Sequence, residues 1–333
     1  MYAAIDIHKQ VFQAAVLDAV SGELVEARFA ATREALGNWA ARWQGTLTDV
    51  AIEATCGWRW VHRELEPRGF TVHLAEPARA RALKGNTRQP KTDRLDARWL
   101  AQLLAKKMLP ESWLPPKDIE RLRDLTRLRQ SLRHDRTRWA QRLHAVLQHE
   151  GWPCARRSLL SPTGQRWLAA LALDAGVRRL VDAHQAMIGA IEEQLAQIDR
   201  ELGTLARSDP RLVALQALYG IGPVIASHLL AEIGEARRFR RSRQLVRAAG
   251  LDPVVLESGD SHRRGHLSKQ GSPHLRWALM QAAQQAARRD RSPDHARYVA
   301  VQKRIGAQRA ALTTARKIAR RAYHVLAALE DAA

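Results

Sequence analysis

The order of short apolar segments in the first 75 residues constrains the fold of this chain more than any other feature. Three apolar runs of strand length follow one another at 2–7, 11–17 and 23–30, with only short turns between them. Two further strands, at 49–54 and 70–75, then alternate with helical segments. A meander followed by a βαβα alternation predicts an α/β domain in which helices flank a mixed sheet.

The helices of this domain are predicted from capping residues and periodicity. Thr32 and Thr92 each precede a helical pattern, and a threonine hydroxyl can accept a hydrogen bond from a free amide of the first turn. We expect helices over 33–43, 58–67, 77–83 and 93–107, and a basic loop over 85–91.

Beyond this domain the pattern becomes helical. A basic amphipathic helix is expected over 118–148, followed by a break at Trp152 and Pro153, and a second long helix over 182–206. The two apolar seams are Leu125, Leu128, Leu132, Trp139, Leu143 and Val146, and Met187, Ile191, Leu195, Ile198, Leu202 and Leu205. Their spacing fits either an antiparallel hairpin within one chain or a coiled-coil contact between two chains.

The chain from 209 onward is also predicted to be helical. The segment 212–231 has no formal charge over about the length of a membrane span, but Gly220, Gly222 and Pro223 interrupt it. We therefore expect two short helices joined by a turn. An irregular loop rich in Gly, Ser, His and Arg is expected over 250–273, and functional residues tend to lie in such loops.

The composition is strongly basic. The chain has 54 Lys and Arg residues against 34 Asp and Glu residues, which gives a net charge of +20, and most of the excess lies in 236–321. This balance predicts a polyanionic partner, while 46% hydrophobic residues exclude a chain that is disordered throughout. Two cysteines are too few for a disulfide framework, and the N-terminus lacks a signal-peptide pattern, so we expect a cytoplasmic protein.

Four carboxylates carry the sharpest chemical signal. Asp6 lies between two isoleucines of a strand and points to the face opposite them, a position that strands rarely give to Asp. Glu53 ends a later strand, and Asp93 and Asp96 share one helix face at i and i+3. Such acids can converge on Mg²⁺, or on Mn²⁺ in its place. The plainer alternatives are a first-turn dipole residue for Asp93 and a surface acid for Glu53.

Two features predict nucleic-acid contacts in the C-terminal part. The turn at Gly220 and Gly222 is similar to a helix-hairpin-helix, in which amides at a helix N-terminus face a phosphate. The alternative is a turn without a ligand. Further basic side chains are expected to contact phosphates, with a solvated basic surface as the alternative: Arg237, Arg238, Arg263, Arg264, Lys269 and Arg276.

The segment 250–273 also contains four serines among these basic residues: Ser258, Ser261, Ser268 and Ser272. A serine among cations can attack phosphorus, because the cations neutralise the charge that develops. The alternative is a loop whose serines only donate hydrogen bonds to phosphate. Chemistry alone does not rank the four.

Three N-terminal motifs and one C-terminal block resemble the DEDD transposases of the insertion sequence 110 family, to which the Piv-type DNA invertases are related. The motifs are Ile-Asp-Ile-His-Lys at 5–9, Ile-Glu-Ala-Thr-Cys-Gly at 52–57 and Lys-Thr-Asp-Arg-Leu-Asp-Ala at 91–97. The block contains Ala-Gly-Leu-Asp-Pro at 249–253, Glu-Ser-Gly at 257–259 and Arg-Gly-His-Leu-Ser-Lys-Gln-Gly at 264–271. The resemblance covers nearly the whole chain, in the family's order.

This resemblance implies a RuvC-like N-terminal domain with an RNase H fold, whose four acids bind Mg²⁺: Asp6, Glu53, Asp93 and Asp96. It implies a C-terminal domain whose nucleophilic serine falls on Ser258 and forms a covalent 5′-phosphoserine link, with both elements in one composite site between subunits. It also implies a structured guide or bridge RNA, from the element's own end, that selects donor and target DNA by base pairing.

We therefore expect a RuvC-like catalytic domain at 1–110, a helical linker and oligomerisation region at 111–206, and a C-terminal transposase domain at 207–333. The predicted function is an Mg²⁺-dependent transposase or site-specific recombinase that acts on DNA as a homodimer or tetramer, at the bacterial nucleoid and not at a membrane. Three alternatives stay open: a hydrolytic Holliday-junction-type nuclease that uses only the four carboxylates, a DNA invertase of the Piv type, and a non-enzymatic nucleic-acid-binding protein.

Overall fold

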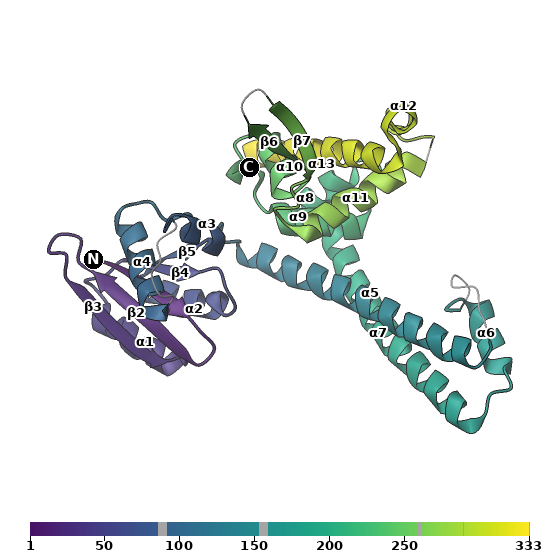
Figure 1. Cartoon of the computed structure of the whole chain (residues 1–333), viewed down its shortest axis with the longest axis horizontal. Coiled ribbons are helices and arrows are strands. Elements are labelled where there is room, and N and C mark those ends of the chain that lie inside the picture. Colours follow the sequence, from purple (N-terminus) through teal and green to yellow (C-terminus); the bar gives the residue numbers. More distant parts are fainter. Residues whose placement is uncertain (86–91, 153–158, 259–260, 289, 333) are drawn as a thin grey trace. The chain divides into compact units, whose positions relative to one another are not determined.

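The computed structural model describes residues 1–85, 92–152, 159–258, 261–288 and 290–332. The chain forms two compact units, Met1–Leu114 and Pro115–Ala333, and each is described by itself (Figure 1). The predicted basic loop at 85–91 lies outside the described residues, apart from Gly85. The division of the chain into three functional parts stays a prediction.

The N-terminal unit is built on a five-stranded sheet. Its strands are β1 Tyr2–Ile7, β2 Val11–Leu17, β3 Leu24–Ala30, β4 Asp49–Glu53 and β5 Thr71–Ala75. They lie in the order β3-β2-β1-β4-β5, in which β1–β2 and β2–β3 are antiparallel and β1–β4 and β4–β5 are parallel. This arrangement confirms the predicted mixed α/β fold and is consistent with a RuvC-like domain.

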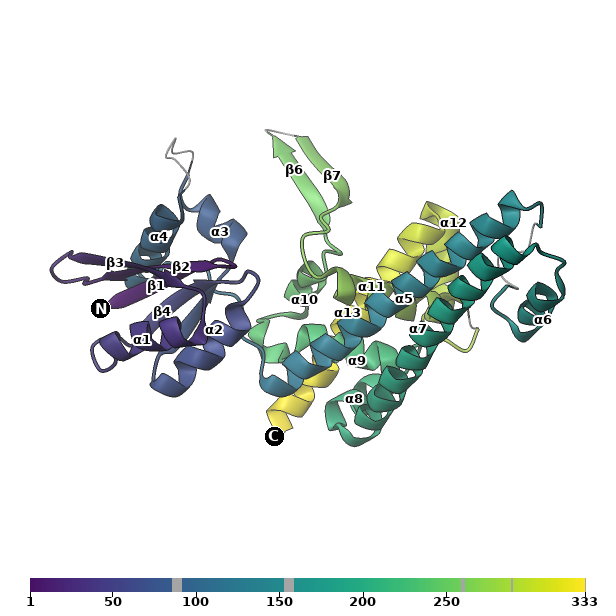
Figure 2. The same ribbon diagram turned by 90° about the horizontal axis from the view of Figure 1, so that it is seen from below.

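The two faces of this sheet carry different kinds of side chain, because successive residues of a strand point to opposite faces. One face packs against α1 Arg33–Trp43 and α2 Trp58–Leu65 through large side chains that include Ile5, Phe12, Leu36, Trp39, Ile52, Leu65 and Phe70. The other face packs against α4 Asp93–Ala105, and Leu100, Leu103 and Leu104 of this helix are buried there. Alanines of the sheet and of the helix belong to the same cluster: Ala4, Ala15, Ala51, Ala75, Ala97 and Ala101. α3 Pro77–Ala82 also lies on this second side (Figure 2).

We call the alanines between the sheet and α4 the alanine layer. They let α4 approach the sheet closely, since a methyl group fills little of the space between two backbones. The helix begins at the N-cap Thr92, whose Oγ1 accepts a hydrogen bond from the Leu95 amide at 3.3 Å. Thr32 caps α1 in the same way, with the Ala35 amide at 3.2 Å. Both predicted caps are confirmed, and α4 brings its first turn to the strand that carries Asp6.

The C-terminal unit begins with a long helical hairpin. α5 Lys117–His149 and α7 Ala175–Ser208 lie side by side, and α6 Pro162–Ala170 lies between them in the chain (Figure 1). The ion pairs between them show that they are antiparallel: Arg121–Glu201, Arg129–Asp199 and Arg136–Glu192. Of the two arrangements that the sequence left open, the structure contains the hairpin within one chain.

The predicted apolar seams of this hairpin are partly wrong. Leu128 and Met187 are 51% and 43% exposed, whereas Thr126 and Ile188 are buried. The Thr126 hydroxyl donates to the Leu122 carbonyl at 2.8 Å, so its polar group is satisfied within α5 and can be buried. Apolar periodicity alone does not detect such a position.

The other helices of this unit pack at one end of the hairpin (Figure 1). They are α8 Pro210–Gln216, α9 Pro223–Ile233, α10 Ser242–Ala248, α11 Pro273–Arg288, α12 His295–Ile305 and α13 Ala307–Ala332. α8 and α9 confirm the two short helices predicted across 212–231, with Gly220 (φ 83°) in the turn and Gly222 as the N-cap of α9. Among the described residues, no helix combines the length and the apolar character that crossing a membrane requires.

The segment 250–273 was expected to be irregular, and the structure corrects this expectation. β6 Pro253–Ser258 pairs antiparallel with β7 Ser261–Leu267. The expectation is wrong because β7 has the sequence Ser-His-Arg-Arg-Gly-His-Leu, which lacks the apolar alternation of a half-buried strand. The β-hairpin stands away from the helices of its unit (Figure 2), so neither strand has to present an apolar face to a core.

α9 buries a histidine without a hydrogen-bond partner. His228 is fully buried, its ring centroid lies 4.7 Å from that of Trp277, and neither ring nitrogen has a partner among the described residues. Burial, together with the charges of Arg129 and His274, lowers the pKa of His228 to about 4. The folded protein therefore holds this ring neutral.

This histidine predicts a loss of stability in acid. The pKa of His228 is about 4 in the folded protein against an ordinary value of 6.5, so the unfolded chain takes up the proton first as the pH falls. The contribution of the neutral ring to the free energy of unfolding is therefore complete above pH 6.5 and is lost as the pH falls through 4. The difference corresponds to about 3 kcal/mol. In urea unfolding between pH 6.5 and 4, His228→Leu should lose stability less steeply than the wild type, and parallel pH profiles would contradict the assignment.

The alanine layer generates a second prediction. Ala97→Leu should lower the free energy of unfolding of the N-terminal unit by about 1–3 kcal/mol, because a larger side chain must fit where α4 meets the sheet. Gln102→Leu places the same side chain on the exposed face of α4 and should change it by less than about 0.5 kcal/mol. Hydrogen exchange of the amides in 1–114 measures both, and equal effects would show that α4 is not closely packed.

Candidate active site

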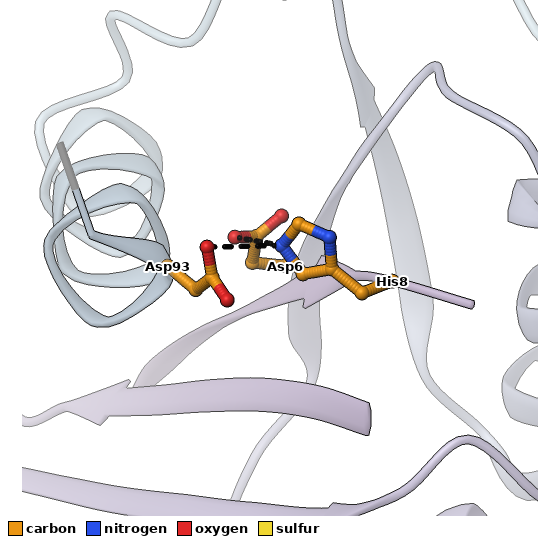
Figure 3. Close-up of side chains that lie close together, drawn as sticks. All are labelled: Asp6, His8 and Asp93. Atoms are coloured by element: carbon orange, nitrogen blue, oxygen red, sulfur yellow. Dashed lines mark hydrogen bonds and ion pairs between the residues drawn. The ribbon is translucent and has the colours of Figure 1, made fainter. Parts of the chain in front are cut away.

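Three titratable side chains lie together at the carboxyl end of β1 (Figure 3). His8 Nε2 lies 3.1 Å from Asp6 Oδ2 and 3.2 Å from Asp93 Oδ1. Asp6 is buried, whereas His8 and Asp93 are exposed, and one ligand atom of each lies within 4.8 Å of the others. The structure thus brings two of the predicted acids together, with a histidine between them.

Strand alternation and the start of α4 explain this cluster. Asp6 follows Ala4 on the alanine face of β1, and His8 continues the same alternation just after the strand ends. Asp93 and Asp96 occupy the first turn of α4, where the helix dipole favours negative charge. That turn is held over the same face, so it meets Asp6.

The cluster gathers negative charges close to one another. Burial raises the pKa of the Asp6 carboxyl, and the charges of Asp93 and Asp96 raise it further, while His8 acts in the opposite direction. Lys84, two residues after α3, forms an ion pair with Asp96. Carboxylates that are held together against their own repulsion form a place that a cation stabilises.

Glu53 reaches the same face by its register. It is the last residue of β4 and follows Ile52, which pairs with Ile5 of β1. It is therefore level with Asp6 and points to the face that α4 covers. Its side chain is half-buried and interacts with another group of the chain.

His8 and Lys84 are the residues of this cluster that sequence reasoning did not single out. His8 has a detectable signal, because it lies two residues after Asp6 and the strand alternation puts both on one face. Lys84 has no such signal, since its pairing with Asp96 is a tertiary contact that no local pattern indicates.

The donor set suits a hard divalent cation. Mg²⁺ takes oxygen ligands from one or two carboxylates and completes its shell with water and substrate phosphate, and Mn²⁺ accepts the same ligands. Asp6 and Asp93 supply such oxygens, and His8 Nε2 lies between them here. A cation held by both acids would replace the imidazole there or take it as a further ligand.

The structure distinguishes the four serines of the C-terminal block. Ser268 Oγ donates to Asp252 Oδ1 at 2.6 Å. Ser272 Oγ donates to Glu232 Oε2 at 2.8 Å and accepts from the Leu275 amide at the start of α11. These two serines are therefore occupied by hydrogen bonds at the base of the β-hairpin.

The other two serines lie at the far end of the β-hairpin. Ser258 is the last residue of β6 and pairs in register with Ser261, the first residue of β7. They flank the turn, on strands that stand away from the helices of the unit (Figure 2).

The arginines predicted to contact phosphate also divide into groups. Arg238 donates to two carbonyls at the end of α9 at 2.8 and 3.0 Å, and Arg276 donates to the Ala249 carbonyl at 3.0 Å. Arg237 forms an ion pair with Asp331. These side chains hold the C-terminal unit together, and their contact with nucleic acid stays a prediction.

The remaining predicted contacts occupy turns and strand ends. Arg263 and Arg264 belong to β7, and Lys269 follows it with a φ of 51°, in the left-handed region. The turn with Gly220 and Gly222 borders a hollow of about 300 Å³. Their contact with nucleic acid likewise stays a prediction.

The comparisons with known proteins match both parts of the chain that hold these residues. Residues 3–150 match a DEDD transposase model of the IS110 group, and residues 213–300 match the model described as transposase IS116/IS110/IS902 family. The fold, the acid cluster and these two matches define a DEDD-type transposase.

Individual relatives extend the match over most of the chain. A probable family 20 transposase of Pseudomonas aeruginosa is 29% identical over 294 residues, which cover 85% of this chain and 83% of that protein. Putative transposase y4rJ of Sinorhizobium fredii is 31% identical over 292 residues, 81% of this chain and 72% of that protein. The transposase for insertion sequence element IS1328 of Yersinia enterocolitica is 27% identical over 240 residues, 70% and 69%. The chain belongs to the IS116/IS110/IS902 family of transposases.

The acid cluster predicts stabilisation by Mg²⁺. A cation that binds only the folded protein adds about 2.7 kcal/mol to the free energy of unfolding when its concentration is 100 times its Kd. Scanning fluorimetry at constant ionic strength should show a rise in Tm with MgCl₂ that EDTA reverses. Asp6→Asn and Asp93→Asn should lose this rise, whereas Glu34→Gln, at an exposed acid of α1, should keep it. An unchanged rise in Asp6→Asn would remove the cation from this cluster.

Proposed function

We propose that this transposase cuts and rejoins DNA in an Mg²⁺-dependent reaction with Ser258 as the nucleophile, and that an RNA from its own element selects donor and target DNA. The observation that carries the proposal is that one chain contains both an acid cluster at the end of β1 and a serine beside the turn of a projecting β-hairpin. Family membership supports the DNA substrate, since the relatives are named as transposases.

The acids have the role of holding the cation. Asp6, Glu53, Asp93 and Asp96 would bind Mg²⁺, with Mn²⁺ as the alternative. The cation, when bound, withdraws negative charge from the scissile phosphate. The four acids come from β1, β4 and one turn of α4, so their positions are fixed by the sheet and the alanine layer. His8 and Lys84 balance part of their charge.

The serine has the role of the nucleophile and becomes covalently linked to the DNA. Ser258 Oγ attacks phosphorus, the P–O3′ bond breaks, the hydroxyl proton of the serine passes to water or a base, and the 3′ oxygen leaves as a hydroxyl after taking up a proton. The products are a 5′-phosphoserine and a free 3′ end. Attack by another 3′ hydroxyl on this phosphoserine rejoins DNA and frees the serine, so no external energy source is needed. Arg263 and Arg264 on β7 would stabilise the developing charge.

The RNA has the role of choosing the sequence. The chain is basic, with a net charge of +20, and phosphate contacts alone give affinity without sequence preference. Base pairing by a guide RNA supplies that preference in other RNA-guided systems. Strand exchange also requires two DNA duplexes to be held together, which favours a homodimer or tetramer.

Covalent trapping tests the proposal. The purified protein is incubated with its element-end RNA, nicked target DNA and Mg²⁺, and a protein–DNA adduct that survives denaturation is measured. Ser258→Ala should reduce the adduct by more than about 10³-fold, because the nucleophile is removed. Ser261→Ala is the matched control, since Ser261 is the register partner of Ser258, and it should keep the adduct.

Each other outcome points to a different function. Cut ends without an adduct in the wild type would mean that water is the nucleophile and that the protein is a hydrolytic nuclease of the Holliday-junction type. An adduct that is lost in Ser261→Ala but kept in Ser258→Ala would show that Ser261, and not Ser258, is the nucleophile. Equal adduct without the RNA would reject guidance by RNA. Inversion of a DNA segment between two sites, without transposition, would indicate a Piv-type invertase.

A further inference from the structure

The C-terminal unit contains a basic hollow that the proposed reaction does not use. It lies between the start of α12 and the middle of α13 and has a volume of about 290 Å³. Arg297, Arg316, Lys317 and Arg320 line it, together with Asp294 and two threonines. Four cations thus face one hollow that contains a single carboxylate.

That carboxylate does not neutralise the hollow. Asp294 is buried, and Arg321 Nη1 and Nη2 bind its two oxygens at 2.5 and 3.2 Å, with Lys317 Nζ at 2.7 Å. Its charge is therefore already balanced by Lys317 and by Arg321, which is not part of the lining. Within the part of the chain that the structure describes, Arg297, Arg316 and Arg320 form no ion pair.

Arg316 is the fixed member of this group. Its Nε donates to the Leu251 carbonyl at 2.7 Å, which holds the guanidinium in place and leaves its other N–H groups for a ligand. Burial lowers the pKa of Arg316, and the charge of Arg320 lowers it further, while Asp252 acts in the opposite direction. Cations crowded in this way repel one another until an anion joins them.

We propose that this hollow binds one phosphate group of a nucleic-acid strand. A planar guanidinium fork matches phosphate oxygens, and the volume is at the lower limit of pockets that enclose small organic molecules, ~300 Å³. Arg297 and Arg320 are exposed, so they reach a strand that runs over α12 and α13. The inference deepens the proposed function, because such a strand is the substrate or guide, but it does not depend on the serine chemistry.

The hollow is also connected to the β-hairpin that carries Ser258. Leu251 lies two residues before β6, and Arg316 joins its carbonyl to the hollow. A phosphate held by Arg316 is therefore linked by one side chain to the base of the β-hairpin that carries Ser258. Binding there fixes the chain segment from which the hairpin starts.

The test removes two cations from the hollow and, in a matched control, two from elsewhere on the same helices. The pocket variant is Arg297→Gln with Arg320→Gln, and the control is Arg304→Gln with Arg309→Gln, which are exposed residues of α12 and α13 outside the lining. Fluorescence anisotropy measures the affinity of the full chain for DNA and RNA oligonucleotides of one sequence, over a range of KCl concentrations. Circular dichroism establishes that both variants fold.

The pocket variant should bind roughly 10-fold more weakly than the control, and its slope of log K against log salt should be shallower by about 1. Equal affinities and slopes in the two variants would overturn the proposal. If inorganic phosphate at constant ionic strength raises the Tm of the wild type but not of the pocket variant, while oligonucleotide binding matches the control, the hollow binds free phosphate and the strand is excluded. A weakened pocket variant together with an absent Ser258 adduct would leave this inference standing and reject the proposed function.

Discussion

The N-terminal unit depends on one constraint, which is that the central strand of its sheet must carry a carboxylate under a helix. Burial costs an ionised Asp6 free energy, and His8 at 3.1 Å offsets part of that cost. Ala4, Ala15 and Ala51 on the same face leave room for α4 to lie close, so that its first turn meets the strand. The large aromatic side chains of the core, such as Phe12 and Trp39, pack on the opposite face and add apolar burial there.

In the C-terminal unit a second buried carboxylate ties the parts together. Glu232 of α9 pairs with Arg127 of α5 and accepts from Ser272 at the start of α11. Burial alone would raise the pKa of Glu232, but Arg127, Ser272 and Arg123 hold it below its ordinary value. At the same junction Gly271 lies so close to the backbone that a Cβ would come within 2.2 Å of the Ala248 carbonyl oxygen. The base of the β-hairpin that carries Ser258 is therefore closely packed against α10 and the start of α11.

The structural features that could be predicted from the sequence are those that depend on a pattern within a few neighbouring residues. The mixed sheet, the caps at Thr32 and Thr92 and the placing of Asp6 opposite its neighbouring isoleucines follow from alternation and capping within a few residues. The β-hairpin was missed because a projecting strand has no core to impose alternation on β7. Lys84 was missed for a related reason, since its pairing with Asp96 is a tertiary contact. Thr126 shows the limit within helices, because a hydroxyl satisfied by its own helix can replace an apolar residue in a seam.

Net charge predicted the kind of partner but not the surface that binds it. Many cations serve the fold itself: Arg129 pairs with Asp199 across the helical hairpin, and Arg238 and Arg276 donate to backbone carbonyls. An arginine engaged in this way gives up part of its capacity to bind phosphate. The cations that matter for a polyanion are those that the fold crowds together and leaves without carboxylates. By that criterion the surface of α12 and α13 around Arg297 and Arg320 is a stronger candidate than the arginines that stand out in the sequence by their density alone.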